Sequence, residues 1–346
     1  MDKKFFMGIA AMAALTLVSC SSDDLNSLSD NSSKNEAISF DGYLGRSAVA
    51  VNGSRGSVLE IADLQKSKDG FGVFGNYNST GGQEFGSNLF NNVKVAYDAS
   101  AETKAWTYSP LKYWPTDGHV DFLAYAPRVD NKQLKGSSID FTVESDAANQ
   151  KDLLWANATS QTKANKTVTF NFKHALAKIG YKVQLNGDYT GTTIKLNKIT
   201  LAGSNDGKGT NKAFYKTGTI DLSYTSTTSS TTKLWTPSEE KQDFEWFSGD
   251  EQLSKTPAVE NPTTKYLFVI PQNFKTGTDQ LYVIVEYTIT YSDNTTVKTK
   301  VCKQLEKEFL QGKAYTINLT IGLTPIEFNA TVDSWGDIED YPITLE

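Results

Sequence analysis

From residue 38 onward the chain alternates apolar and polar residues in short stretches. In residues 38–44, isoleucine, phenylalanine, glycine and leucine take every second position, with serine, aspartate and tyrosine between them. Glycine, asparagine, aspartate and serine interrupt such stretches repeatedly, and no segment of about 12 or more residues keeps a helical period. A period of two is typical of strands that bury one face. The sequence therefore predicts an all-β protein.

Similar stretches recur to the end of the chain. We expect further strands at residues 72–74, 93–97, 106–108, 120–125, 168–172, 179–185, 194–199, 266–270, 281–287, 315–321, 326–332 and 341–345. The turn at 292–295 is expected to fold 287–289 back onto 297–301 as a hairpin. Many short strands separated by turns predict β-sandwiches or barrels.

The first 37 residues differ in character from the rest. Lys3 and Lys4 precede an apolar run over 5–18, which has the length of a signal-peptide core and is shorter than the roughly 20 residues of a membrane-spanning helix. The run ends at Cys20 after small residues, as in the lipobox of bacterial lipoproteins, where the cysteine is acylated. We predict a signal peptide at 1–19 and a disordered tether at 20–37 that is rich in Ser, Asn and Asp.

Asp23 and Asp24, just after the lipidated cysteine, resemble the acidic tag that sends some lipoproteins to the outer face of the outer membrane. About 300 residues follow the tether, a length that predicts about two domains. The polar segment 157–166 is the best place for a linker, so we expect an N-terminal sandwich at 38–163 and a C-terminal sandwich at 164–346.

Charge and cysteine content narrow the choice of partners. The net charge is −6, so the chain has no basic surface for nucleic acid. With Cys20 lipidated, Cys302 is the one cysteine left, and no disulfide can form within the mature chain. We expect Cys302 to be a buried strand thiol, with an exposed position left open.

No sequence pattern points to catalysis or metal binding. His119 and His174 lack the spacing of a metal site, and no G-x-S-x-G elbow is present. His119 is expected in a turn and His174 as a packed residue of a strand or turn. We predict no metal, no cofactor and no enzymatic activity.

A set of motifs in fixed order resembles the fimbrillin family, over roughly residues 38–335. The motifs are Gly72–Phe74, Tyr108–Pro115, Val120–Pro127, Asp152–Ala156, Phe170–Ile179, Phe268–Gln272 and Gly312–Leu319. The resemblance implies two tandem transthyretin-like β-sandwich domains and export as an outer-membrane lipoprotein. It further implies a surface fimbrium (type V pilus) with a role in adhesion to a host or bacterial surface ligand, and other pilus subunits as partners.

The resemblance also implies a mode of assembly. A protease removes the first strand, here the one carrying Ile38, Phe40 and Leu44, and a strand of another subunit fills the groove by β-strand addition. Two of the three arginines follow this strand. Arg46 is our predicted cleavage residue because Gly45 and Ser47 flank it with small residues, and Arg55 is the second choice.

The predicted donor is the C-terminal strand with Tyr341, Ile343 and Leu345, which alternates correctly. The same strand could instead complete its own sandwich as an ordinary edge strand, as in a tip or accessory subunit. The sequence leaves stalk and tip positions open.

A monomeric surface lipoprotein that binds glycans is the alternative function. Trp106, Trp114 and Trp155 lie inside the family motifs and are expected in the core. Trp235 and Trp246 flank a loop-rich region and are the candidates for an exposed aromatic platform.

Overall fold

The computed structural model describes residues 36–44, 61–100, 105–225, 234–260 and 266–323, and the backbone of residues 327–334 and 341–344. Within these residues nearly all regular structure is β, which confirms the predicted all-β class. The described helices are α1 (Ile61–Lys66) and the short 3-10 helices η2 (Ala147–Asn149) and η3 (Lys163–Asn165). None of the described helices is long and apolar enough to span a membrane.

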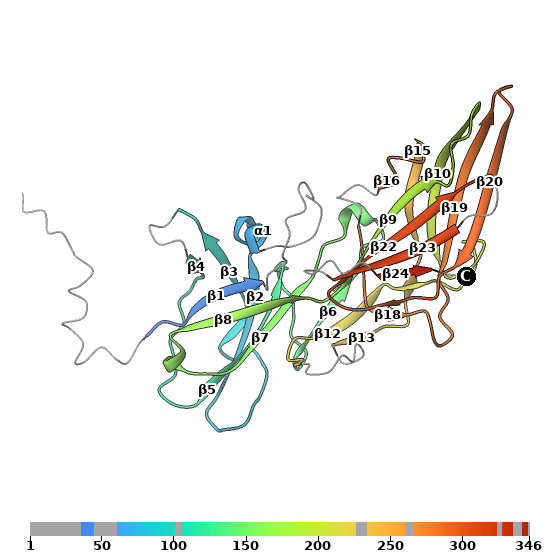
Figure 1. Cartoon of the computed structure of the whole chain (residues 1–346). Helices are drawn as coiled ribbons and strands as arrows, with labels where there is room; N and C mark the ends of the chain where they lie inside the picture. Colours follow the sequence, from blue (N-terminus) through green and yellow to red (C-terminus); the bar gives the residue numbers. More distant parts are fainter. Residues whose placement is uncertain are drawn as a thin grey trace, which may run out of the picture.

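The first sheet has seven strands and lies apart from the later strands of the chain (Figure 1). In spatial order its strands are β1 (Ser39–Leu44), β8 (Thr167–His174), β7 (Leu154–Gln161), β5 (His119–Ala126), β2 (Phe71–Asn78), β3 (Phe90–Asp98) and β4 (Ala105–Thr107). β1 and β4 are the two ends of this order, and they nevertheless approach each other. The sheet therefore curls around its own core.

Two larger sheets face each other in the later part of the chain. One contains β16 (Val259–Glu260), β9 (Ala177–Leu185), β22 (Lys313–Ile321), β23 (Glu327–Ser334) and β24 (Tyr341–Thr344), with β17 (Leu267–Val269) also paired to β9. The other contains β15 (Phe244–Gln252), β10 (Thr192–Ala202), β19 (Tyr282–Tyr291) and β20 (Thr296–Gln304). The rings of Tyr181 in β9 and Trp246 in β15 meet edge to face at 4.8 Å, so the sheets pack as a sandwich.

Three small sheets complete the described structure. They pair β6 (Ser138–Thr142) and β13 (Trp235–Pro237) with β12 (Thr217–Asp221), β11 (Phe214–Tyr215) with β14 (Lys241–Gln242), and β18 (Gln272–Asn273) with β21 (Glu308–Phe309). β6 precedes β7 and β8 in the chain, but it pairs with β12 rather than with the first sheet. The two parts of the chain are therefore joined by strand pairing as well as by the covalent connection.

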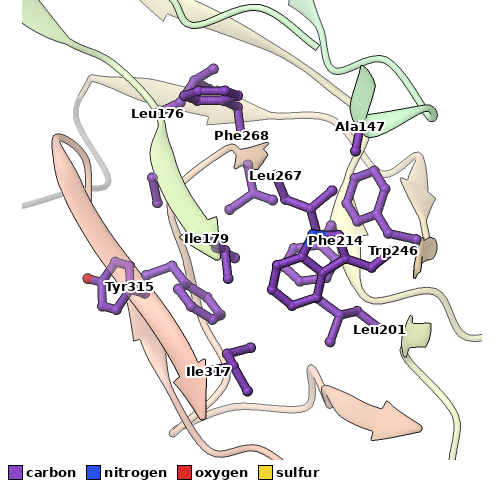
Figure 2. Packing of buried hydrophobic residues seen from close by; sticks show 14 of the residues in the cluster. Ala147, Leu176, Ile179, Leu201, Phe214, Trp246, Leu267, Phe268, Tyr315 and Ile317 are labelled. Atoms are coloured by element: carbon purple, nitrogen blue, oxygen red, sulfur yellow. The ribbon is translucent and has the colours of Figure 1, made fainter. Parts of the chain in front are cut away.

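Buried side chains form two clusters. One fills the inside of the curled first sheet and includes Phe122 of β5. The other fills the sandwich, where Ile179 and Ile317 of one sheet face Leu201 and Trp246 of the other (Figure 2), and it extends to Tyr125 of β5. β5 therefore contributes to both clusters, which explains why almost all of its residues are buried.

Comparison with the expected organisation gives one confirmation and one difference. The hairpin turning at 292–295 is confirmed, because Tyr287 pairs with Thr299 and Ile289 with Val297. The predicted domain boundary at 163/164 falls before β8, and the chain leaves the first sheet for the last time between His174 and Ala177. The polar segment chosen as the linker instead contains the end of β7 and η3, which connect two strands of the same sheet. The division into two domains stays a prediction.

Candidate functional site

The candidate site is β1 and the groove that holds it, at the outer edge of the first sheet (Figure 1). β1 pairs with β8 in parallel, with Ser39 opposite Thr167 and Leu44 opposite Phe172. β8 is the one strand in the described part of the chain to which β1 is paired. β1 is thus an end strand of this sheet, and its removal breaks backbone pairing with one neighbour only.

Residues 112–114 form backbone hydrogen bonds with the residues just before β1. The backbone N–H of Ile38 donates to the carbonyl of Lys112 at 2.9 Å, and the N–H of Trp114 donates to the carbonyl of Glu36 at 3.0 Å. Ala37 and Tyr113 form an isolated antiparallel bridge between these bonds. Residues 36–38 are therefore paired with residues 112–114, whereas β1 itself is paired with β8.

The apolar face of β1 fills the groove. Ile38, Phe40 and Leu44 are 1%, 4% and 9% exposed. The ring of Phe40 contacts four other aromatic rings with centroid separations of 5.3–5.7 Å, namely those of Phe90, Tyr108, Phe122 and Phe170. Burying each such side chain contributes about 1.5–3 kcal/mol. Phe40 is therefore the main anchor of the strand.

Gly42 takes the remaining inward position, between Phe40 and Leu44. A Cβ atom built on Gly42 would lie 3.5 Å from the Phe172 ring and 3.6 Å from the indole of Trp106 in β4. These are ordinary van der Waals distances, so a methyl group fits there. Because Trp106 is itself only 8% exposed and packs against Phe71 and Tyr97, it has little freedom to make room for more.

Tyr108 adds a polar contact at the same edge. Its hydroxyl donates to the carbonyl of Ile38 at 2.7 Å and accepts from the N–H of Lys112 at 3.2 Å. Burial raises the pKa of Tyr108 above its ordinary value, while the contact with the Lys112 backbone acts in the opposite direction. The neutral phenol therefore connects the residue before β1 to the 112–114 segment.

The outward face of β1 is polar, since Ser39, Asp41 and Tyr43 are exposed. The Ser39 hydroxyl donates to the carbonyl of Lys166 at 2.9 Å, and the Asp41 carboxylate accepts from the N–H of Gly42 at 2.9 Å. These contacts are solvent-exposed and add little to stability. The apolar face accordingly decides which strand the groove can hold.

Several predicted site residues lie outside the described residues: Cys20, Arg46, Arg55 and Leu345. β1 ends at Leu44, so Arg46 follows the strand directly. The backbone of the predicted donor is described as β24, in which Tyr341 pairs with Val332 and Ile343 with Ala330 of β23. β24 is the end strand of its sheet, so its outer edge carries no described strand.

The histidines each contact one aspartate. His119, which begins β5 rather than lying in a turn, places Nε2 3.2 Å from Asp121 Oδ2. His174 is confirmed as a packed strand residue, with Nδ1 2.7 Å from Asp152 Oδ2. In the described part of the chain no three His, Cys, Asp or Glu side chains gather as a metal site.

The tryptophans of the described residues are buried and do not form the exposed aromatic platform expected for glycan binding. Trp106, Trp114 and Trp155 are confirmed as core residues, at 8%, 5% and 2% exposed. The expectation that Trp235 and Trp246 are exposed is wrong, because each is only 2% exposed. Trp235 donates its indole N–H to the carbonyl of Ala175 at 2.8 Å, and Trp246 packs on Tyr181, so both hold the sandwich together.

Sequence reasoning also missed features of the groove. The sequence places Trp106 in the core only, and it indicates no contact with the first strand for Tyr108 or for the backbone of 112–114. One signal was available, since Tyr108 to Pro115 is among the family motifs and such a cluster of aromatic and proline residues marks a fixed contact. Cys302, expected in the interior, is exposed on the edge strand β20.

The fold and the groove together define a class of protein: an all-β chain whose first strand completes the edge of a sheet, the geometry that strand addition uses. The sequence matches the family described as fimbrillin-like over residues 61–335. The chain therefore belongs to the fimbrillin-like family, which confirms the resemblance seen in its motifs.

The chain is also similar to several individual proteins. The chain is 25% identical to the fimbrium subunit Fim1C of Phocaeicola vulgatus over 389 aligned residues, which cover 98% of each protein. Among solved structures it is similar to a protein of Bacteroides ovatus assigned to cell adhesion, with 16% identity, a TM-score of 0.48, and coverage of 90% of this chain and 99% of the other. It is also similar to the tip fimbrial protein Mfa3 of Porphyromonas gingivalis, with 10% identity, a TM-score of 0.37, and coverage of 76% and 92%.

Proposed function

We propose that this chain is a subunit of a surface fimbrium with a role in adhesion and without catalytic activity. Membership of the fimbrillin-like family supports the proposal, as does the relative named a fimbrium subunit, which aligns over almost the whole chain. In this proposal the chain is exported as a lipoprotein through Cys20 and reaches the outer membrane before processing. Its partners are other fimbrial subunits.

We further propose that assembly proceeds by cleavage after Arg46, with Arg55 as the second choice, and by loss of β1. The observation that carries this is the position of β1, which is paired to β8 alone while Ile38, Phe40 and Leu44 fill an aromatic groove. A cut just beyond Leu44 separates the strand covalently from the rest of the sheet.

Loss of β1 would leave the groove exposed to water. Three apolar side chains at about 1.5–3 kcal/mol each would be withdrawn from it. The outer edge of β8 would also carry unpaired backbone groups, which favour pairing with another strand. A strand from a neighbouring subunit can satisfy both, because ladder hydrogen bonds and side-chain pockets act together in strand addition.

The C-terminal strands are the proposed source of the donor. The predicted donor with Tyr341, Ile343 and Leu345 includes β24, which forms the end of its sheet and pairs with β23 alone among the described strands. An end strand can leave without breaking the rest of the sandwich.

The test is controlled cleavage of the chain from residue 21 onward. Limited trypsin should cut after Arg46, and the product should form multimers that resist SDS. Arg46→Gln should abolish both effects, whereas Arg55→Gln should leave them intact. A cleaved chain that stays monomeric would contradict assembly between copies of this chain and point to a tip or accessory position.

Lipid attachment is tested separately in cells. Cys20→Ala should remove incorporation of labelled palmitate, while Cys302→Ala should leave it unchanged. Equal labelling of the Cys20→Ala variant would contradict lipidation at this residue.

A further inference from the structure

The groove under β1 selects its occupant by size at one position. Three of the four inward residues, Ile38, Phe40 and Leu44, have large buried side chains. The remaining one, between Phe40 and Leu44, is Gly42. The Trp106 indole and the Phe172 ring stand 3.5–3.6 Å from where a Cβ of residue 42 would be. An alanine fits, whereas atoms beyond Cβ would overlap rings that are themselves packed.

The groove therefore prescribes a pattern for any strand that enters it parallel to β8. The inward positions must read large apolar, aromatic, small and large apolar, with polar residues between them. Ile38 and β1 together, residues 38–44, read Ile-Ser-Phe-Asp-Gly-Tyr-Leu.

The same pattern occurs once more near the C-terminus. Residues 326–332 read Ile-Glu-Phe-Asn-Ala-Thr-Val, with an aromatic ring at Phe328 and a small side chain at Ala330 in the matching places. The polar positions also correspond, since Asn329 can accept the hydrogen bond from the following N–H that Asp41 accepts in β1. Most of this segment is β23, so its backbone is already extended.

The final strand does not meet the size requirement. If Tyr341 takes the place of Phe40, Ile343 comes opposite Trp106. If Ile343 takes that place, Leu345 comes opposite Trp106. The one other register that reaches this position puts Tyr341 itself opposite Trp106. All three registers of 341–345 therefore place a large side chain where the groove has room for a methyl group.

We infer that Trp106 makes the groove specific for residues 326–332 of a second copy of this chain, rather than for residues 341–345. The inference rests on the proposed function, in which β1 leaves the groove. β23 and β24 form the end of their sheet beyond β22, so the two can leave together and uncover one strand. The occupant is thus a β23 segment in the register that places Ala330 against Trp106.

Peptide exchange tests the groove without requiring assembly. The chain from residue 21 onward is cleaved after Arg46, and native mass spectrometry records which segment stays bound to it. A synthetic peptide of residues 325–333 in excess should displace the fragment that contains β1. The same peptide with Ala330→Leu should bind about tenfold more weakly or worse, and a peptide of residues 340–346 should not compete. Equal binding of the Leu peptide, or stronger binding of 340–346, would overturn the inference.

A paired change separates size selection from general damage. Trp106→Ala in the chain enlarges the position, so it should restore binding of the Ala330→Leu peptide relative to the unchanged peptide. If the preference between the two peptides is the same with and without Trp106, the ring does not set the specificity and the inference fails.

Assembly of the full chain distinguishes this inference from the proposed function. Multimers that persist with Ala330→Leu and disappear when residues 341–346 are deleted would keep strand exchange and refute the β23 assignment. Size-dependent peptide binding by a cleaved chain that never forms multimers would support the groove's specificity and refute self-assembly.

Discussion

The hydroxyl of Tyr108 donates a 2.7 Å hydrogen bond to the backbone carbonyl of Ile38 and so joins the segment after β4 to the first strand. The same hydroxyl accepts from the N–H of Lys112, whose carbonyl in turn accepts from Ile38. One half-buried phenol therefore connects two backbone groups, the carbonyl of Ile38 and the N–H of Lys112. Ionisation or loss of this phenol should loosen β1 specifically.

Tyr108→Phe should therefore speed the release of β1 from the cleaved chain. A net loss of about 0.5–1.5 kcal/mol is expected for one hydrogen bond. Burial raises the folded pKa of Tyr108, so its contribution is complete below the unfolded pKa of about 10 and is lost as pH rises through the folded pKa. The release rate of β1, measured against pH, should rise in this alkaline window for the native chain and less for Tyr108→Phe. Tyr43→Phe, on the exposed face, is the control, and identical pH profiles for all three proteins would contradict the prediction.

Phe40→Ala should remove the anchor of β1. The ring contacts four others inside the curled sheet, and loss of a buried phenylalanine typically costs about 3–5 kcal/mol. Urea unfolding should show this loss, and β1 should dissociate after cleavage without added peptide. Tyr43→Ala should change the unfolding free energy by less than about 0.5 kcal/mol, since Tyr43 is 48% exposed. A comparable loss in both variants would show that Phe40 is not the anchor.

The sandwich should lose stability at alkaline pH because of the buried phenol of Tyr315. Its hydroxyl accepts the N–H of Leu310 at 2.8 Å, and burial raises its pKa to about 12. Because the folded pKa lies above the unfolded value, the stabilisation is present below pH about 10 and is lost as pH rises towards 12. Tyr315→Phe leaves the Leu310 N–H without this acceptor and should cost about 1–3 kcal/mol at neutral pH. Unfolding free energy measured at neutral and alkaline pH checks both statements, and an undiminished value at neutral pH would refute the first.

Cys302 should react while the protein is folded. It lies exposed on β20, the end strand of the four-stranded sheet. In the chain from residue 21 onward it is the single thiol, so one maleimide should attach without denaturant, and far-ultraviolet circular dichroism should stay unchanged. Labelling that requires denaturant would place the thiol in the interior, as the sequence alone suggested.

Local patterns predicted the strands well because their causes are local. The hairpin between β19 and β20 follows from two alternating stretches and a polar turn, in which Asn294 adopts a positive φ of 65°. The predicted linker shows what local patterns cannot distinguish, because a polar stretch looks the same whether it joins two domains or two strands of one sheet. β7 and β8 are joined by such a stretch, and only their pairing partners reveal it.

The candidate site was predicted only in part. Alternation identified the inward face of β1, but its partner β8 lies more than a hundred residues away, and no periodicity encodes that pairing. Trp235 and Trp246 were misjudged because the neighbouring sequence is polar, while their burial depends on β9 and the Ala175 carbonyl. The likeness of residues 326–332 to 38–44 is visible in the sequence. The sequence does not show why the small residue matters, because the contact of position 42 with Trp106 appears only in the structure.

The parallel pairing of β1 with β8 would impose an order on folding during the proposed export. Ser39 lies beside Thr167, 128 residues further along the chain, so β1 would have no partner strand until that later segment had crossed the membrane. An exported chain that emerges from its N-terminus would therefore pair β1 later than the strands that find their partners nearby. Throughout that interval the groove would be open to any matching strand, so such subunits would have to be kept apart until each had paired its own β1.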